Sequence, residues 1–276
     1  MENKIWFITG ISSGLGKALA QTVIENGDFV IGTFRNQTQA DVFNNQHKDE
    51  AFAFVLDITQ PEQIDRTFKR VKDEFGRVDV LVNNAGFGFA GAVEETSSDE
   101  VRAVFEANFF GALKLTQAFL PLLRQQKSGH IIQISSHGGF KAFAGFGIYN
   151  ASKFALEGFS EALAQEVSPL GIKLTIVEPG PFRTSFAGSG LKLAEQTIAD
   201  YDETAGVFRE RIKGVDGKQE GDPDKAAKAI FEIAQLDNPP LRLPLGKIAL
   251  LSLATKLESV KNDLDSFKHI AESVVF

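Results

Sequence analysis

The 276-residue chain contains no cysteine, one methionine, two tyrosines and four histidines. The absence of cysteine excludes disulfides, thiolate nucleophiles and thiolate metal ligands. The histidines form no cluster with the spacing of metal ligands, so we expect no catalytic or structural metal; they are His47, His130, His137 and His269.

The sequence also lacks a cluster of basic residues and a long apolar run. Its 36 Asp and Glu outnumber its 29 Lys and Arg, giving a formal net charge of −7, so we expect neither nucleic acid nor an anionic membrane as a partner. No stretch approaches the roughly 18 apolar residues of a transmembrane helix, and no leader segment precedes the first apolar run. We therefore expect a cytoplasmic protein.

Short apolar runs alternate with longer amphipathic ones, as in βαβ units. We expect seven strands, at residues 4–9, 29–34, 51–56, 78–82, 130–135, 173–177 and 241–243. This order predicts an α/β fold with a doubly wound, parallel, seven-stranded, Rossmann-like sheet. Because βαβ connections are right-handed, the carboxyl ends of the strands share one edge, where ligands bind in such sheets.

Two segments depart from this pattern. Residues 181–221 are helix-like but interrupted by glycines, and we expect them to form a lid over the substrate. Residues 246–276 have apolar positions at helical spacing, which predicts a helical tail packed on the body or on another subunit. The remainder, residues 1–245 with the lid, is expected to be a single catalytic domain.

Tyr149 and Lys153 are four residues apart and therefore share one face of a predicted helix. A nearby cation favours phenolate, so Lys153 is placed to lower the pKa of Tyr149. This spacing is common on ordinary helices. However, the chain has 25 phenylalanines and only two tyrosines, so a hydroxyl at this position indicates chemistry rather than packing.

A glycine-rich turn lies between the first apolar run and a helix-like segment, with the spacing Gly-x-x-x-Gly-x-Gly. Glycines allow the backbone to approach a pyrophosphate closely, and the N-terminus of the following helix attracts its charge. The alternative is that the glycines only turn the chain. The predicted phosphate site comprises Gly10, Ser12, Ser13, Gly14, Leu15 and Gly16.

Two further motifs end apolar runs: Asn83-Asn84-Ala85-Gly86, and Ser136 thirteen residues before Tyr149. Together with the glycine turn and the Tyr149–Lys153 pair, these motifs occur in the same order as in the short-chain dehydrogenase/reductase family. The chain resembles this family over residues from about 4 to about 245. The resemblance implies that Tyr149 transfers a proton, that Lys153 lowers its pKa and binds the nicotinamide ribose, and that Ser136 fixes the substrate oxygen. It also implies that Asn108 holds a water linking the lysine to solvent, although Asn108 could instead be a satisfied core amide.

The resemblance also indicates which residues contact the cofactor. Asp57, with Ile58, matches the residue that meets the adenine, but Asp57 could equally be the N-cap of the following helix. Other expected contacts are Asn84, Ala85 and Gly86 after the fourth strand, and Pro179, Gly180, Phe182 and Thr184 after the sixth.

The end of the second strand bears on the choice between NADP(H) and NAD(H). A carboxylate there would accept hydrogen bonds from an adenosine 2′-hydroxyl and repel a 2′-phosphate. The chain instead has Arg35, suited to bidentate phosphate contact, followed by Asn36. We therefore predict NADP(H), with NAD(H) as the alternative because Ser12 and Ser13 occupy positions where many NADP-preferring relatives place a basic residue.

Aromatic residues gather where the substrate should bind, which favours an apolar ketone or secondary alcohol. The predicted pocket contains Phe87, Phe89, His137, Phe143 and Phe186, and this pattern resembles the branch containing 17β-hydroxysteroid and retinol dehydrogenases. We predict an NADP(H)-dependent carbonyl and alcohol oxidoreductase that forms a homodimer or homotetramer. The alternatives are an NAD(H)-preferring or sugar-type dehydrogenase, a nucleotide-sugar epimerase or dehydratase, and a non-catalytic dinucleotide sensor.

Overall fold

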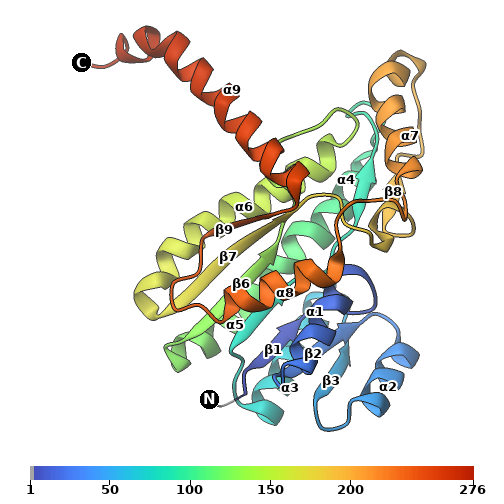
Figure 1. Ribbon diagram of the computed structural model, residues 1–276, viewed down its shortest axis with the longest axis vertical. Helices are drawn as coiled ribbons and strands as arrows, with labels where there is room; N and C mark the ends of the chain where they lie inside the picture. The colour runs from blue at the N-terminus through green and yellow to red at the C-terminus, as the bar shows by residue number, and fades with distance from the viewer. Residues whose placement is uncertain (1–2) are drawn as a thin grey trace.

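A computed structural model describes residues 3–276, and its centre is a parallel seven-stranded sheet (Figure 1). The strands lie in the order β3-β2-β1-β4-β6-β7-β9. Their bounds are β1 Ile5–Ile8, β2 Phe29–Phe34, β3 Ala51–Val55, β4 Val80–Asn83, β6 Gly129–Ile134, β7 Ile172–Pro179 and β9 Arg242–Leu245. All seven predicted strands are confirmed, with ends that differ from the predicted ones by at most two residues.

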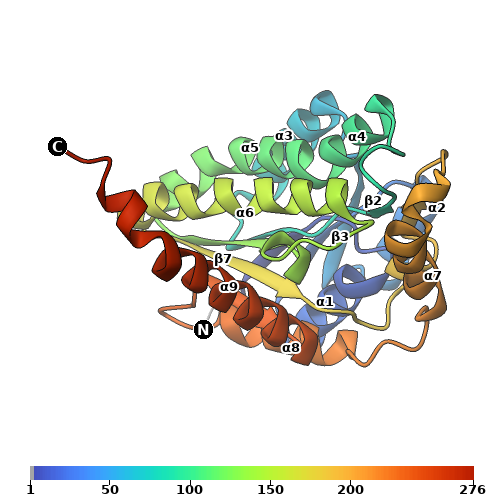
Figure 2. The same ribbon diagram turned by 90° about the horizontal axis from the view of Figure 1, so that it is seen from above.

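Helices cover both faces of the sheet, as predicted for a doubly wound fold (Figure 2). One face packs on α1 (Gly14–Glu25), α2 (Gln37–Gln46) and α8 (Pro223–Ala234), and the other on α3 (Pro61–Phe75), α5 (Gly111–Gln126) and α6 (Gly147–Val167). Successive side chains of a strand point to opposite faces. In β1, Trp6 and Ile8 therefore enter the first core and Phe7 the second, and all three are fully buried.

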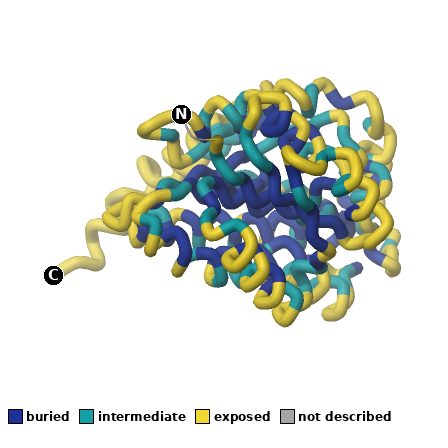
Figure 3. Tube along the Cα trace, turned by 90° about the horizontal axis from the view of Figure 1, so that it is seen from below, coloured by how far each residue is buried: buried dark blue, intermediate teal, exposed yellow. Residues whose placement is uncertain are grey.

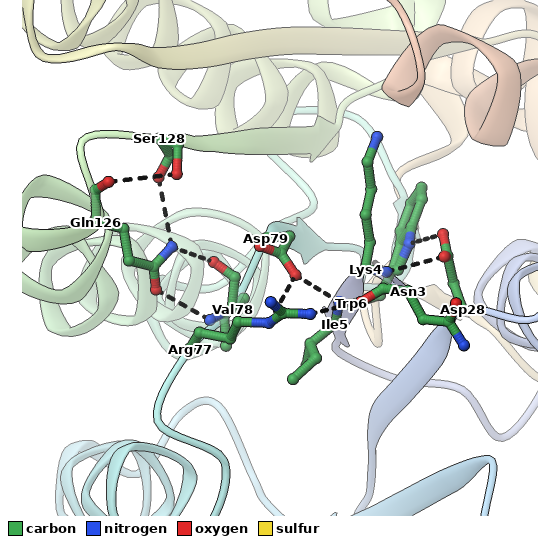
Figure 4. Close-up of polar contacts among 10 residues, drawn as sticks. All are labelled: Asn3, Lys4, Ile5, Trp6, Asp28, Arg77, Val78, Asp79, Gln126 and Ser128. Carbon is green, nitrogen blue, oxygen red and sulfur yellow. Dashed lines mark hydrogen bonds and ion pairs between the residues drawn. The ribbon is translucent and has the colours of Figure 1, made fainter. Parts of the chain in front are cut away.

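The amino ends of the central strands are held by polar side chains (Figure 4). Asp79 accepts a hydrogen bond from the Ile5 N–H at 2.7 Å, and Asp28 accepts from the Lys4 N–H at 2.9 Å and from the Trp6 indole at 3.0 Å. These contacts satisfy backbone groups and a buried indole at the ends of β1 and β4. They fix the edge of the sheet opposite the one where the glycine turn lies.

The order of the strands reverses between β1 and β4, because β2 and β3 extend to one side and β6, β7 and β9 to the other. In such sheets ligands bind outside the carboxyl ends of the two strands at the reversal. The glycine turn follows β1 and the Asn-Asn-Ala-Gly segment follows β4, so the fold brings both motifs to this crevice.

The segment predicted to be a lid contains more than interrupted helix. Its strand β8 (Leu191–Leu193) pairs in parallel with β5 (Gly88–Ala90), and short helical turns lead to α7 (Val207–Gly214). The sequence analysis did not predict this small second sheet. It ties the lid to the loop after β4, beside the carboxyl edge of the main sheet.

The tail is one helix, α9 (Lys247–Glu272), as its apolar spacing predicted. Ala249 and Ser252 in its first turns are buried, whereas every residue from Leu257 onward is exposed (Figure 3). The expectation that the tail packs on the body therefore holds only for its beginning. No helix within residues 3–276 combines the length and apolar character needed to cross a bilayer.

Candidate active site

A cavity of about 1490 Å³ lies along the carboxyl edge of the sheet, from the end of β2 to the lid. Most of the predicted site residues line it: Gly10, Ser12, Ser13, Gly14, Leu15, Arg35, Asp57, Ile58, Asn84, Ala85, Gly86, Phe87, Ser136, His137, Phe143, Tyr149, Lys153, Pro179, Gly180, Phe182, Thr184 and Phe186. Gly16, Asn36, Phe89 and Asn108 do not line the cavity. The structure therefore gathers four separate motifs around one space.

The glycine turn requires its glycines for two different reasons. Gly10 and Gly14 have φ of +71° and +58°, where a side chain would introduce strain. Gly16 has no room for a side chain, because a Cβ there would lie 2.3 Å from Asn84 Nδ2. This close packing places the N-terminus of α1 against the end of β4.

The N-terminus of α1 is open to an anion. Its N-cap, Ser13, makes no side-chain capping hydrogen bond, and the first turn contains no acidic residue. The first N–H groups of the helix can therefore donate to a ligand, with the helix dipole favouring negative charge. This geometry fits the pyrophosphate of a dinucleotide.

Two threonines support the glycine turn through contacts that the sequence did not predict; Thr33 was expected only to add a neutral polar group beside Arg35 at the cofactor. Thr9 Oγ1 accepts hydrogen bonds from the N–H groups of Asn84 at 2.9 Å and Ala85 at 3.0 Å, which joins the ends of β1 and β4. Thr33 Oγ1 accepts from the Gly10 N–H at 3.0 Å. Thr9 directly follows β1 and Thr33 is the last residue but one of β2, and a threonine at the carboxyl end of a buried apolar strand is the signal that could have identified them.

Tyr149 lies in the wall of the cavity between two aromatic rings. Its ring stacks on Phe146 with centroids 4.3 Å apart and meets Phe186 edge-on at 5.7 Å. Burial raises the pKa of Tyr149 to about 12, and a hydrogen bond shared with Ser136 opposes this shift. In this structure the phenol is therefore a protonated donor at neutral pH, and the lowering of its pKa expected from Lys153 is not seen.

Ser136 follows β6 and is positioned by the backbone of the next turn. Its Oγ accepts a hydrogen bond from the Gly138 N–H at 3.0 Å. Because that contact uses a lone pair, the hydroxyl proton remains available to donate. Ser136 can thus hold an oxygen atom beside Tyr149.

Lys153 is buried one helical turn beyond Tyr149, as the four-residue spacing predicted. Its Nζ donates to the Ile134 carbonyl at 2.9 Å and lies 6.0 Å from the centroid of the Tyr149 ring. Burial lowers the pKa of Lys153 to about 8, while the nearby carboxylate of Glu157 acts to raise it. The carbonyl at the end of β6 therefore fixes the ammonium group within the cavity wall.

Asn108 is held by hydrogen bonds on both ends of its amide. Its Oδ1 accepts from the Phe87 N–H at 3.0 Å, and its Nδ2 donates to the Phe87 carbonyl at 2.9 Å and to Ser152 Oγ at 3.2 Å. Asn108 lies in a π-helical turn, Glu106–Phe110, between α4 (Ser98–Phe105) and α5. Such turns frequently mark functional sites, and this one widens the helix where Asn108 reaches the loop after β4.

The end of β2 places Arg35 and Asn36 differently. Arg35 is exposed, lines the cavity and has no ion pair among residues 3–276. Asn36 Oδ1 instead accepts from the Gln39 N–H at 3.1 Å and caps α2. The Asn36 side chain therefore caps α2, and the predicted cofactor contact at Asn36 stays a prediction.

Asp57 lines the cavity but is not the helix cap that we considered as its alternative role. The N-cap of α3 is Gln60, and the Asp57 carboxylate accepts from the N–H and hydroxyl groups of Thr59 at 2.9 and 2.8 Å. The carboxylate therefore closes a local turn after β3. Its position at the cavity wall remains compatible with an adenine contact.

The part of the cavity under the lid combines aromatic and aliphatic side chains with charged ones, which are Lys192, Arg211, Lys218 and Glu220. One face of α7 lines it with apolar side chains at helical spacing, opposite Phe87, Phe143 and Phe186; these α7-side residues are Phe208, Ile212 and Val215. The predicted pocket residue Phe89 does not line the cavity; it is 3% exposed and packs in the same apolar cluster as Phe146 and Tyr149 of the cavity wall. His137 lines the wall, with its Nδ1 3.1 Å from Ser252 Oγ of α9.

The lid is fastened by one buried carboxylate. Glu95 accepts hydrogen bonds from the N–H groups of Ala92 at 2.7 Å and Ile198 at 2.9 Å, and it forms an ion pair with Arg209 of α7. Burial alone raises the pKa of Glu95, but these hydrogen bonds and the guanidinium hold it below its usual range. Glu95 therefore joins three segments around the apolar part of the cavity.

Comparison with known proteins agrees with this geometry. A family model described as short chain dehydrogenase matches residues 4–192. A short-chain dehydrogenase from Streptomyces avermitilis has a crystal structure similar over all of both chains, with a TM-score of 0.94 and 43% identity. A 3-ketodihydrosphingosine reductase of Bacteroides thetaiotaomicron is 37% identical over 256 residues, 92% of each chain. ElxO with NADP bound is 26% identical, covers 88% of this chain and 97% of its own, and has a TM-score of 0.72.

Proposed function

Because the chain belongs to the short-chain dehydrogenase family, whose members are oxidoreductases that use a nicotinamide dinucleotide, we propose that it is an NADP(H)-dependent enzyme interconverting an apolar ketone and a secondary alcohol. One observation carries the proposal: Ser136, Tyr149 and Lys153 meet where the phosphate-binding turn adjoins the aromatic part of the cavity. A carbonyl placed there lies within reach of two hydroxyl donors.

The residues around the cavity fit a dinucleotide along its length. The glycine turn and the N-terminus of α1 would hold the pyrophosphate, Asp57 and Ile58 the adenine side, and Lys153 the nicotinamide ribose. When bound, the dinucleotide supplies or accepts a hydride at the substrate carbon. The end of β7 and the segment after it lie at the same edge and would support the nicotinamide end, through Pro179, Gly180, Phe182 and Thr184.

In the direction of reduction, Ser136 would orient the substrate oxygen and Tyr149 would donate a proton to it. The pKa of Tyr149, raised to about 12 by burial, keeps the phenol protonated for this step. For alcohol oxidation the phenol must release its proton. The ammonium group of Lys153 would stabilise that phenolate.

Arg35 supports the preference for NADP(H). It stands at the end of β2, where a carboxylate would exclude a 2′-phosphate, and it has no ion pair among the described residues. The aromatic lining under the lid favours an apolar substrate. The reductase from Bacteroides thetaiotaomicron is named for a keto derivative of dihydrosphingosine, which makes a ketone with a long aliphatic chain a natural first candidate.

The test is a fluorescence titration of the purified protein with NADPH and NADH, followed by absorbance assays of NADPH oxidation. The substrate panel should contain 3-ketodihydrosphingosine, aromatic and aliphatic ketones, and a polar keto sugar. We expect tighter binding of NADPH and turnover of apolar ketones. Preference for NADH, or turnover of the sugar alone, would contradict the proposal, and dinucleotide binding without any turnover would favour a sensor.

A further inference from the structure

Most of α9 has no contact with the body of the protein (Figure 1). From Leu257 to the end of the chain every residue is exposed, including Leu257 at 60%, Leu264 at 66% and Phe267 at 59%. Large apolar side chains in such a row are costly to leave in water, and an isolated helix of about four turns is marginally stable. The exposed face therefore requires a partner.

The apolar residues of this face recur at alternating intervals of three and four. The series is Leu250, Leu253, Leu257, Val260, Leu264, Phe267, Ala271 and Val274. Residues of this kind at positions a and d of more than three heptads are the pattern of a coiled coil. The stripe is narrower than the apolar face of a helix that packs on a globular core.

We propose that α9 forms an antiparallel two-stranded coiled coil with α9 of a second copy of this chain. The chain itself supplies a partner helix with a matching stripe. A membrane surface fits less well, because α9 carries four lysines and four acidic residues and so has no net basic face.

Antiparallel pairing with Leu257 opposite Val260 of the second copy gives apolar layers from Leu250 to Phe267, and Ala271 and Val274 lie beyond the overlap of the two helices. The same alignment places Leu253 opposite Leu264, and Leu250 opposite Phe267. It also sets Lys256 beside Asp263 of the second copy, twice by symmetry, near the middle of the coil. This alignment also pairs two like charges, Lys247 with Lys268 of the second copy. The pair lies at each end of the coil, because Lys247 is the first residue of the helix.

A parallel pair is less favourable for two reasons. At the flanking g and e positions it would place Lys256 beside Lys261 of the second copy in the middle of the coil, a repulsion that cancels the attraction between Asp263 and Lys268 of the second copy. The a positions Leu250, Leu257 and Leu264 also lack the β-branched side chains that favour parallel dimers.

The molar mass in solution tests the pairing. We compare the full chain with a Leu257→Asp/Leu264→Asp variant and with a Ser259→Asp/Asn262→Asp control, which adds the same charge to the outer face of the helix. Light scattering during size-exclusion chromatography should show the mass halved in the first variant and unchanged in the control. A monomeric wild-type chain would overturn the proposal, as would a molar mass that does not change in the Leu257→Asp/Leu264→Asp variant. If the monomeric wild-type chain also floats with phosphatidylserine vesicles, the partner of the exposed face is a membrane surface instead.

The absence of cysteine allows the alignment to be tested by cross-linking. Leu257→Cys and Val260→Cys proteins are mixed, allowed to exchange and then oxidised, with Asn262→Cys as the outer-face control. The antiparallel coil predicts a disulfide between the two different proteins and little within either alone. Disulfides within each protein alone would show a parallel pair, and no disulfide above the Asn262→Cys level would show no coil; either result refutes the proposal.

Discussion

Lys153 Nζ donates a hydrogen bond to the backbone carbonyl of Ile134 at 2.9 Å, which ties the helix of the active site to the end of β6. Ser136 follows that strand by two residues. The contact therefore fixes the distance between the ammonium group and the serine that would orient the substrate. It also leaves a cation buried in the wall of the cavity.

The burial of Lys153 makes the free energy of unfolding depend on pH. Its pKa is about 8 in the folded protein against 10.5 for an ordinary lysine, so between these values the unfolded chain binds more protons and the free energy of unfolding rises with pH. Replacement by Met should therefore stabilise the protein most below pH 8, by up to about 3 kcal/mol, with the gain shrinking toward pH 10. Urea unfolding of the wild type and the variant, below pH 8 and near pH 10, measures this difference in the free energy of unfolding. Lys69→Met on the exposed face of α3 is the control, and an equal gain at both pH values would contradict the lowered pKa.

Tyr149→Phe should abolish most turnover while leaving NADPH binding intact, because the ring packing between Phe146 and Phe186 is preserved. General acid catalysis contributes roughly a hundredfold to ten-thousandfold, and we expect a loss of kcat in that range. Single-turnover assays and NADPH titration give the two values. The only other tyrosine, Tyr201, lies in the lid and donates a hydrogen bond to Glu94, so Tyr201→Phe is the matched control. Near-normal turnover by Tyr149→Phe would remove the proposed proton donor.

The sheet and the catalytic face were predictable because they depend on local patterns. Each strand is a short apolar run, and the four-residue spacing of Tyr149 and Lys153 sets both on one side of α6. Contacts between distant segments were not predictable. The strands β5 and β8 have three residues each and lie about a hundred residues apart, so neither shows a pattern of its own.

Where a side chain has two possible partners, the sequence alone did not predict which of them it contacts. Asn36 could meet a cofactor or cap α2, and only the backbone geometry of the turn assigns it to the cap. Phe89 was predicted to line the pocket from its place beside Phe87. In the structure Phe89 is buried behind the lining, in the apolar cluster that includes Phe146 and Tyr149, because packing rather than composition decides which aromatic rings reach the cavity.

Arg35→Asp should weaken NADPH binding and improve NADH binding relative to it. Charge-assisted hydrogen bonds contribute about 1.5 to 3 kcal/mol, so a loss of roughly tenfold to a hundredfold in NADPH affinity is expected. Arg124→Asp, an exposed arginine on α5 outside the cavity, makes the same charge change and should leave both affinities alone. Fluorescence titrations with each dinucleotide provide the comparison, and an unchanged preference would assign Arg35 to the solvent.

Arg209→Met should loosen the lid without unfolding the sheet. It leaves the Glu95 carboxylate buried without its counter-ion, which typically destabilises by about 3 to 5 kcal/mol. Because Glu95 also holds Ala92 and Ile198, the effect should appear as faster hydrogen exchange in residues 195–215 and as a raised KM for ketone. Lys213→Met removes an exposed ion pair with Glu210 on the same helix, which contributes little, and should change neither. Equal exchange rates in the two variants would show that the buried ion pair does not hold the lid closed, and the β5–β8 pairing and the packing of Phe208 on Phe146 would then be the contacts to test next.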